Sequence, residues 1–181
     1  MKLFLLFFSL VCLSLPKLQA QETTALQVGD KAPQFSLPYA TRDSVSREKI
    51  SLSDMVGKRT IILAFYPADW SGGCTKEMCT MRDNFSDLSK LDANIFGISG
   101  DYAFSHHEWA KSLNLPFVLL SDHQHTVAKQ YLSYNDETGF NKRTVYVVDT
   151  SGKIAYIDKE YHAGDPQSFE KLQKALAQIH Q

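Results

Sequence analysis

The sequence predicts an α/β fold with a central mixed β-sheet flanked by helices. Short apolar runs alternate with segments of helical periodicity along most of the chain, which is typical of strands joined by helical crossovers. Near the C-terminus the order changes to two strands joined by a tight turn and then a last helix. The first pattern builds parallel strands and the second adds antiparallel ones, so we expect a mixed sheet.

The first twenty residues are expected to be an export signal and not part of the fold. Lys2 supplies a positive start, an apolar stretch runs from Leu3 to Leu15, and Leu18-Gln19-Ala20 resembles a cleavage site. The apolar stretch is too short for a typical membrane-spanning helix. A membrane anchor formed by an uncleaved signal stays open as the alternative. We therefore assign residues 1–20 to a signal peptide and 21–181 to one domain.

The first half of the domain contains the strand that we place at the centre of the sheet. Residues 28–52, with two prolines, are expected to form an N-terminal hairpin extension and a loop. Residues 60–65 are continuously apolar after a turn-like Gly-Lys-Arg, as in a strand covered on both faces. Apolar residues then recur at helical spacing after Cys74 (Met78, Met81, Phe85, Leu88 and Leu91), so Cys74 is expected at the N-terminus of a helix.

The second half continues the alternation and then adds the hairpin. The expected strands are 94–99, 117–120, 143–149 and 153–158, the last two joined by a turn at 150–153. We expect Asp101 to cap a helix that runs to about Leu113, and a short helix over 126–131. Asp165-Pro166 opens a last amphipathic helix, because proline is favoured in a first helical turn.

Composition excludes some functions and directs attention to the cysteines. The formal net charge is −1, which gives no field to attract nucleic acid or an anionic membrane. Cys12 is lost with the signal, so Cys74 and Cys79 remain in a chain expected in an oxidising compartment. A bridge between them closes a very short loop and stabilises the fold little, so redox chemistry is the better use of the pair.

The spacing of Cys74 and Cys79 gives their chemistry a geometric condition. Five residues along an ideal helix separate two Cα atoms by about 8 to 9 Å, on different sides of the helix. A disulfide needs Cα atoms within about 7 Å. If both lie in one helix, one sulfur must react first and wait as an oxidised intermediate until the first turns unwind.

Cys74 is the better candidate for the first role. A helix N-terminus offers unpaired amides and a positive potential that stabilise a thiolate. Gly72 and Gly73 allow the backbone to approach a small substrate closely. The alternative of an inert buried cysteine fits poorly with small and polar neighbours.

The pattern Pro67-x-x-x-Ser71-x-x-Cys74 resembles the active-site signature of the peroxiredoxins. Phe-Tyr-Pro followed by Cys-Thr-Lys-Glu-x-Cys is similar to their bacterioferritin-comigratory, or Q, branch. The similarity spans nearly the whole domain, from Gly29-Asp-Lys-Ala-Pro33 through Leu120-Ser-Asp122 to Arg143-x-x-x-Val147-Val-Asp149. It implies a thioredoxin-like fold and a peroxidase that uses no cofactor and no metal.

The resemblance also implies a role for each matching residue. Cys74 would be the peroxidatic cysteine that attacks a hydroperoxide and becomes a sulfenic acid, and Cys79 the resolving cysteine. Ser71 would hydrogen-bond the peroxide, Pro67 would shield the thiolate, and Arg143 would stabilise the thiolate and polarise the substrate. Fixed donors of this kind suit a reaction that places negative charge on the departing oxygen.

Several residues keep alternatives open at this stage. Ser71 also suits a helix cap, and Arg143 a surface salt bridge. Glu77 is either a solvated first-turn acid or a partner of Arg143, and Trp70 either shapes access or packs on the surface. The family usually has threonine at Ser71 and often proline at the next position, so the loop here is expected to be looser.

Two other functions compete with the peroxidase. A thioredoxin-type thiol-disulfide oxidoreductase shares the fold, but its cysteines are spaced Cys-x-x-Cys. A copper-binding chaperone on the same scaffold would use two thiols and a histidine from His106, His107, His123 and His125.

The expected partners are a hydroperoxide substrate and a thioredoxin-like dithiol reductant that reopens the disulfide. We expect no nucleic acid and no stable membrane association, a monomer in preference to an oligomer, and a periplasmic or secreted location.

Overall fold

The computed structural model describes residues 25–179, so the expected signal peptide lies outside the described residues. A seven-stranded sheet has the order β2-β1-β5-β4-β3-β8-β9. Its strands are β1 (Ser36–Ala40), β2 (Val45–Ser51), β3 (Thr60–Phe65), β4 (Ala93–Ser99), β5 (Val118–Ser121), β8 (Thr144–Val148) and β9 (Ile154–Asp158). The helices are α1 (Leu52–Met55), α2 (Gly72–Asp83), α3 (Phe85–Lys90), α4 (Ala103–Leu113), α5 (Thr126–Gln130) and α6 (Pro166–Ile179).

The sheet is mixed, as predicted. β3, β4 and β5 are parallel neighbours, whereas β8 pairs antiparallel with β3 and with β9. The N-terminal hairpin of β1 and β2 is also confirmed, and it extends the sheet because β1 pairs antiparallel with β5. The strand at 60–65 is near the centre, next to β4 and β8, which explains its continuous apolar run.

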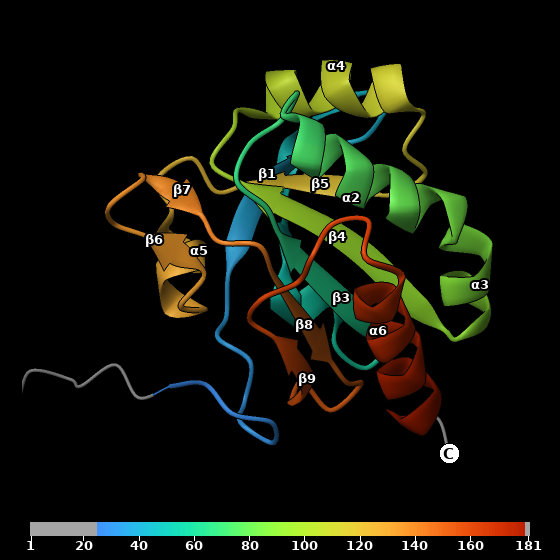
Figure 1. Cartoon of the computed structure of the whole chain (residues 1–181). Coiled ribbons are helices and arrows are strands. Elements are labelled where there is room, and N and C mark those ends of the chain that lie inside the picture. Colours follow the sequence, from blue (N-terminus) through green and yellow to red (C-terminus); the bar gives the residue numbers. More distant parts are fainter. Residues whose placement is uncertain (1–24, 180–181) are drawn as a thin grey trace, which may run out of the picture.

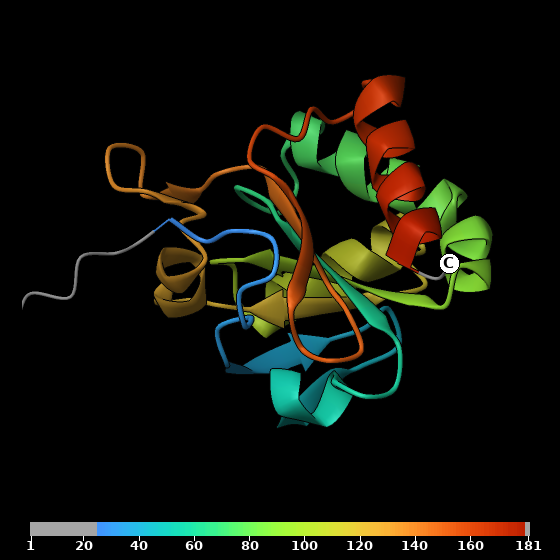
Figure 2. The same cartoon turned by 90° about the horizontal axis from the view of Figure 1, so that it is seen from below.

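Residues of β3 alternate between two hydrophobic layers. Ile62 and Ala64, with Tyr66 just beyond the strand, belong to a cluster that includes buried residues of α2, α3, α4 and α6. Ile61, Leu63 and Phe65 belong to the opposite cluster, with buried residues of α1 and α5. Figures 1 and 2 show α2, α3 and α6 together on one side of the sheet. The chain leaves β3 at its C-terminal end and enters α2 after one short loop, which places Cys74 at this edge of the sheet.

Two local predictions were wrong. The helix after Cys74 is not continuous, because Asn84 separates α2 from α3 and its side chain donates to the carbonyl oxygen of Thr80 at 2.8 Å. The main-chain amide of Asn84 donates to the same oxygen at 3.2 Å, so the regular helical bonding reaches Asn84 and stops there. Asp101 does not cap α4, since the capping position is occupied by Tyr102 and has no side-chain cap bond. The Asp101 carboxylate instead accepts from the amide of Asp69 at 2.9 Å.

The structure also adds a feature that periodicity did not predict. A two-stranded ribbon, β6 (Tyr134–Asn135) and β7 (Phe140–Asn141), lies between α5 and β8. Its strands are too short to show an alternating pattern. No helix within residues 25–179 is long and apolar enough to cross a membrane.

Candidate active site

Cys74 lies in the first turn of α2, as predicted. Ser71 is the N-cap residue, with extended backbone angles, and its Oγ accepts a hydrogen bond from the amide of Cys74 at 3.3 Å. Capping uses a lone pair of the hydroxyl oxygen, so its hydrogen stays available for donation. Ser71 therefore has the chemistry for both roles that the sequence left open.

The start of α2 presents positive potential beside the thiol. The first main-chain bond of the helix runs from the amide of Thr75 to the carbonyl oxygen of Ser71 at 2.9 Å. The amides of Gly72 and Gly73 precede this bond, so they belong to the orphan donors of a helix N-terminus. Such amides stabilise negative charge placed near them.

Arg143 brings a full positive charge to the same sulfur. It directly precedes β8, which lies beside β3, and its Nη2 donates to Sγ of Cys74 at 3.6 Å. A Cβ atom at Gly73 would lie 3.0 Å from this Nη2. A bare backbone at Gly73 thus gives the guanidinium room to approach Cys74, and Arg143 is not an isolated surface charge.

Glu77 holds the other side of the guanidinium. Its side chain is completely buried, and its Oε2 forms an ion pair with Nη1 of Arg143. Burial raises the pKa of Glu77 from 4.5 to about 7, although the charge and hydrogen bond of Arg143 act in the opposite direction. The second oxygen, Oε1, has no hydrogen-bond partner among residues 25–179. Glu77 is therefore the partner of Arg143 and not a solvated acid.

The pKa of Arg143 rises above its ordinary value. Burial lowers it, but the charges of Glu77 and Cys74 and the bonds to them together raise it more. The main chain is also fixed, because the amide of Tyr161 donates to the carbonyl oxygen of Arg143 at 3.2 Å. The guanidinium is thus a permanent cation, held between a buried carboxyl and a thiol.

The thiol of Cys74 is fully buried, which the sequence did not reveal. The residue has 0% exposure and belongs to the same hydrophobic cluster as Tyr66, Met78 and Val145. Low polarity around the sulfur strengthens its interactions with Arg143 and the helix amides.

Cys79 occupies the same helix and is partly exposed. Both cysteines are free thiols. Their five-residue separation within α2 corresponds to a Cα distance of about 8 to 9 Å, which exceeds the range of a disulfide. With both thiols free, a disulfide between Cys74 and Cys79 therefore requires part of α2 to unwind, as expected from the sequence.

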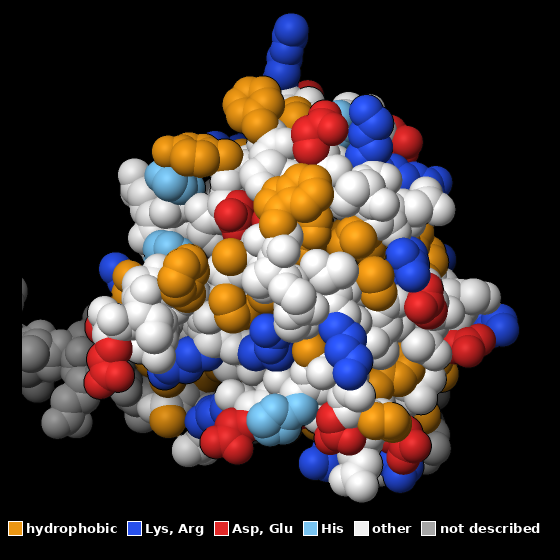
Figure 3. Space-filling model, turned by 45° about the horizontal axis from the view of Figure 1, so that its top comes forward, with side chains coloured by type: hydrophobic (Ala, Val, Ile, Leu, Met, Phe, Trp, Pro, Cys, Tyr) orange, Lys and Arg blue, Asp and Glu red, His pale blue; other side chains and the backbone are white. Residues whose placement is uncertain are grey.

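Pro67 and Trp70 lie in the loop between β3 and α2. Pro67 is partly buried, one residue beyond Tyr66. Trp70 has a left-handed backbone (φ 62°) and is 58% exposed, and its Nε1 donates to Oγ of Ser105 in α4 at 3.2 Å. Tyr102 and Phe104, at the start of α4, are also exposed. Figure 3 shows exposed hydrophobic side chains on this end of the molecule.

The four histidines considered for copper do not converge. Their ring nitrogens contact different groups: His106 contacts Asp69 and the Leu120 carbonyl, His107 the Thr41 carbonyl, His123 the Gly100 carbonyl, and His125 the Asn141 side chain. Within residues 25–179, no three His, Cys, Asp or Glu side chains form a group suited to a metal ion. The copper-chaperone alternative has no ligand set in this part of the chain.

Sequence reasoning missed one buried group beside the site. Asp69 and His106 form a hydrogen-bonded pair whose side chains are both fully buried, 2.9 Å between Oδ2 and Nδ1. Asp69 looked like an ordinary loop residue. The helical spacing of His106 with Trp109 and Ala110, all buried, was the available signal.

Residues 28–157 match the AhpC/TSA family. The putative peroxiredoxin bcp of Coxiella burnetii is 41% identical over 139 residues, which are 74% of this chain and 88% of that protein. Peroxiredoxin Bcp of Bacillus subtilis is 34% identical over 135 residues, 71% of this chain and 82% of its own. The chloroplastic peroxiredoxin Q of Oryza sativa subsp. japonica is 41% identical over 143 residues, but only 63% of that longer protein is covered.

Solved structures agree with these relatives. Peroxidoxin BcpB of Mycobacterium tuberculosis superposes with a TM-score of 0.72 at 30% identity, covering 86% of this chain and 97% of its own. AhpC of Enterococcus faecalis, at 22% identity, shares the fold with a TM-score of 0.76 over 87% and 94% of the two chains. Together with the thiol, guanidinium and helix N-terminus at one site, these matches show that the chain has the thioredoxin-like peroxiredoxin fold and belongs to the AhpC/TSA family as a thiol-dependent peroxidase.

Proposed function

We propose that Cys74 is the peroxidatic cysteine and Cys79 the resolving cysteine of this peroxidase. One observation carries the assignment: the Cys74 sulfur lies at the N-terminus of α2 and 3.6 Å from Nη2 of Arg143. Cys79 lies further along α2, and the guanidinium of Arg82, one turn beyond it, binds the neighbouring Asp83. Of these two cysteines, Cys74 is the one that combines both sources of positive charge.

The first step is attack of the Cys74 thiolate on one oxygen of the peroxide. A sulfur–oxygen bond forms, the oxygen–oxygen bond breaks, and the leaving oxygen takes up a proton to give water or an alcohol. Arg143 and the Ser71 hydroxyl are donors beside the sulfur, so they stabilise the charge that moves onto this oxygen. Pro67, partly buried in the preceding loop, limits the access of water.

The second step forms the disulfide. The thiol of Cys79, as thiolate, attacks the sulfenic sulfur of Cys74, and the hydroxyl leaves as water after taking up a proton. The first turns of α2 must uncoil for this, since the helix holds the two Cα atoms too far apart. A thioredoxin-like dithiol then reduces the disulfide by exchange and is itself oxidised.

The reductant needs a surface on which to dock near α2. Trp70, Tyr102 and Phe104 are exposed at 58%, 60% and 75%, and the bond from Trp70 to Ser105 places the start of α4 beside the loop before α2. Large exposed apolar side chains are typical of interaction sites. We propose that these side chains contact the reductant, and that the peroxidase works as a monomer, as the resemblance to the Q branch implies.

Export remains a proposal that rests on the N-terminal sequence. Lys2, the apolar stretch to Leu15 and the Leu18-Gln19-Ala20 site support it, and the family match begins only at residue 28. We expect secretion into the periplasm or the medium.

The cysteine assignments predict different losses of activity. With hydrogen peroxide and a thioredoxin system, Cys74→Ser abolishes peroxide consumption because Cys79 lies neither in the first turn of α2 nor against Arg143. Cys79→Ser allows one turnover and then stops, because the sulfenic acid has no resolving thiol. Peroxide loss followed over many turnovers measures both effects. Full activity of Cys74→Ser would sink the proposal, whereas full activity of Cys79→Ser would remove only the resolving role.

The raised pKa of Glu77 predicts that the free energy of unfolding depends on pH. Between pH 4.5 and about 7 the folded protein binds a proton at Glu77 that the unfolded chain has lost, so this group's contribution to stability falls as pH rises through that window. The glutamine of the Glu77→Gln variant does not titrate, so the variant lacks this pH dependence. Relative to wild type, its free energy of unfolding should rise by on the order of 2 kcal/mol between pH 5 and pH 8. Urea unfolding at both pH values measures the difference, and a constant difference would contradict a raised pKa.

Mass spectrometry of the protein secreted by its own cell tests export. The mature chain is expected to begin at Gln21. Recovery of a chain that still carries residues 1–20 would favour the membrane-anchor alternative.

A further inference from the structure

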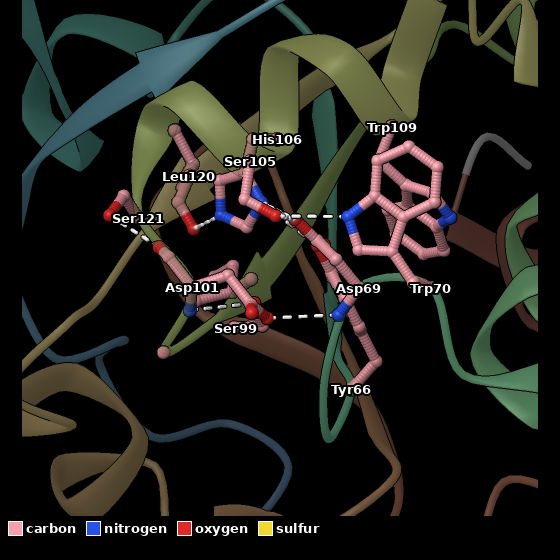
Figure 4. Close-up of polar contacts among 12 residues, drawn as sticks. Tyr66, Asp69, Trp70, Ser99, Asp101, Ser105, His106, Trp109, Leu120 and Ser121 are labelled. Atoms are coloured by element: carbon pink, nitrogen blue, oxygen red, sulfur yellow. Dashed lines mark hydrogen bonds and ion pairs between the residues drawn. The ribbon is translucent and has the colours of Figure 1, made fainter. Parts of the chain in front are cut away.

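A buried polar cluster joins the loop before α2 to helix α4 (Figure 4). At its centre, the Asp69 carboxylate lies 2.9 Å from Nδ1 of His106. Tyr66 donates its hydroxyl to the same carboxylate at 2.8 Å, and so does Ser105, also at 2.8 Å. The carboxylate therefore receives three directional bonds in a site without access to water, and these fix its orientation.

The hydrogen bonds determine where the protons lie. Nε2 of His106 faces the carbonyl oxygen of Leu120 at 3.2 Å, and a carbonyl only accepts, so Nε2 carries a hydrogen. Nδ1 faces the Asp69 carboxylate, so a second proton lies between these two groups. The hydroxyls of Tyr66 and Ser105 donate to the same carboxylate. Asp69 and His106 therefore share one proton within a fixed set of buried hydrogen bonds.

The main chain of Asp69 has a second anchor. Its amide donates to Oδ2 of Asp101 at 2.9 Å, and Oδ2 also accepts from the hydroxyl of Ser99, the last residue of β4, at 2.7 Å. Asp69 is therefore tied to α4 through its side chain and to the end of β4 through its backbone. Figure 4 shows both sets of contacts around the same residue.

Only Trp70 separates this anchored residue from the Ser71 cap. Two residues of chain span at most about 7 Å, so the position of Asp69 restricts that of Ser71. Trp70 adds a further restraint, because its left-handed backbone turns the chain and its indole is bonded to Ser105. The Asp69–Ser71 segment is therefore fixed from the side of α4, and not by α2.

We propose that Asp69 and His106 are positioning residues for the reaction of Cys74, which rests on the proposed peroxidase mechanism. The pair holds the Asp69–Ser71 segment, and with it the Ser71 hydroxyl and the beginning of α2, in the geometry that receives the peroxide. The same segment is the fixed end from which α2 uncoils to bring Cys79 to the sulfenic acid. Neither residue of the pair contacts the sulfur, so both act through Ser71.

The test separates peroxide attack from disulfide formation. In a Cys79→Ser background, the rate of sulfenic acid formation at Cys74 is measured by rapid mixing with hydrogen peroxide. Asp69→Asn and His106→Asn should each lower this second-order rate constant about ten- to a hundredfold, as expected for a displaced donor. With Cys79 present, disulfide formation from the sulfenic acid should keep its rate or become faster. The milder Ser105→Ala, which removes one donor to the carboxylate, should lower the attack rate less.

His107→Asn is the matched control. It is the same change one position along α4, but Nδ1 of His107 contacts the carbonyl oxygen of Thr41 at 2.9 Å and not Asp69. Its attack rate should equal that of wild type.

The outcomes distinguish this proposal from the peroxidase mechanism. If the Asp69 and His106 variants melt at lower temperature but, while folded, react with peroxide at the wild-type rate, the pair is only structural and the proposal is overturned. If the Asp69 and His106 variants do not fold, a wild-type rate of attack on peroxide in Ser105→Ala overturns the proposal instead. Failure of the wild-type protein to form a sulfenic acid would instead overturn the mechanism itself.

Discussion

The geometry of helix α2 is the constraint on which the rest of the structure depends. The helix presents Cys74 in its first turn, where orphan amides favour negative charge, and places Cys79 five residues further along. In the proposed mechanism, the intact helix thus supports attack on the peroxide and holds Cys74 and Cys79 too far apart for a disulfide. Both requirements are met only if α2 is stable enough to form the site and weak enough to open. Its first turn contains two glycines and it ends after three turns at Asn84, which suits a helix that opens locally.

Two contacts hold the guanidinium of Arg143 beside the sulfur of Cys74. The guanidinium contacts both Cys74 and Glu77, which lie three residues apart on the same face of α2. Burial of Glu77 raises its pKa to about 7, so near neutral pH this carboxyl is only partly charged and competes less strongly with the thiolate for the cation. If α2 uncoils as proposed, Cys74 and Glu77 move relative to β8, and the contacts of Arg143 must change with them. Uncoiling of α2 would therefore be coupled to loss of the contacts that Arg143 makes with Cys74 and Glu77.

Much of the fold and the centre of the site could be predicted from the sequence. The apolar run at 60–65 identified a central strand, and the spacing after Cys74 identified a helix start, because both signals are local. The break at Asn84 could not be predicted because the apolar spacing continues through it into α3. Asp101 was expected to cap α4, but an acceptor is free to bond any nearby amide, and the fold offers that of Asp69. Asp69 and His106 are 37 residues apart, and no local pattern connects them.

The uncoiling of α2 is most directly tested by hydrogen exchange of the reduced and the peroxide-treated protein, read by mass spectrometry. The account predicts that amides of residues 72–82 lose protection when the Cys74–Cys79 disulfide forms, while those of β3 and β4 keep theirs. Peroxide-treated Cys79→Ser, which stops at the sulfenic acid, should keep the protection of α2. Unchanged protection of α2 in a sample whose Cys74–Cys79 disulfide is complete would contradict the account.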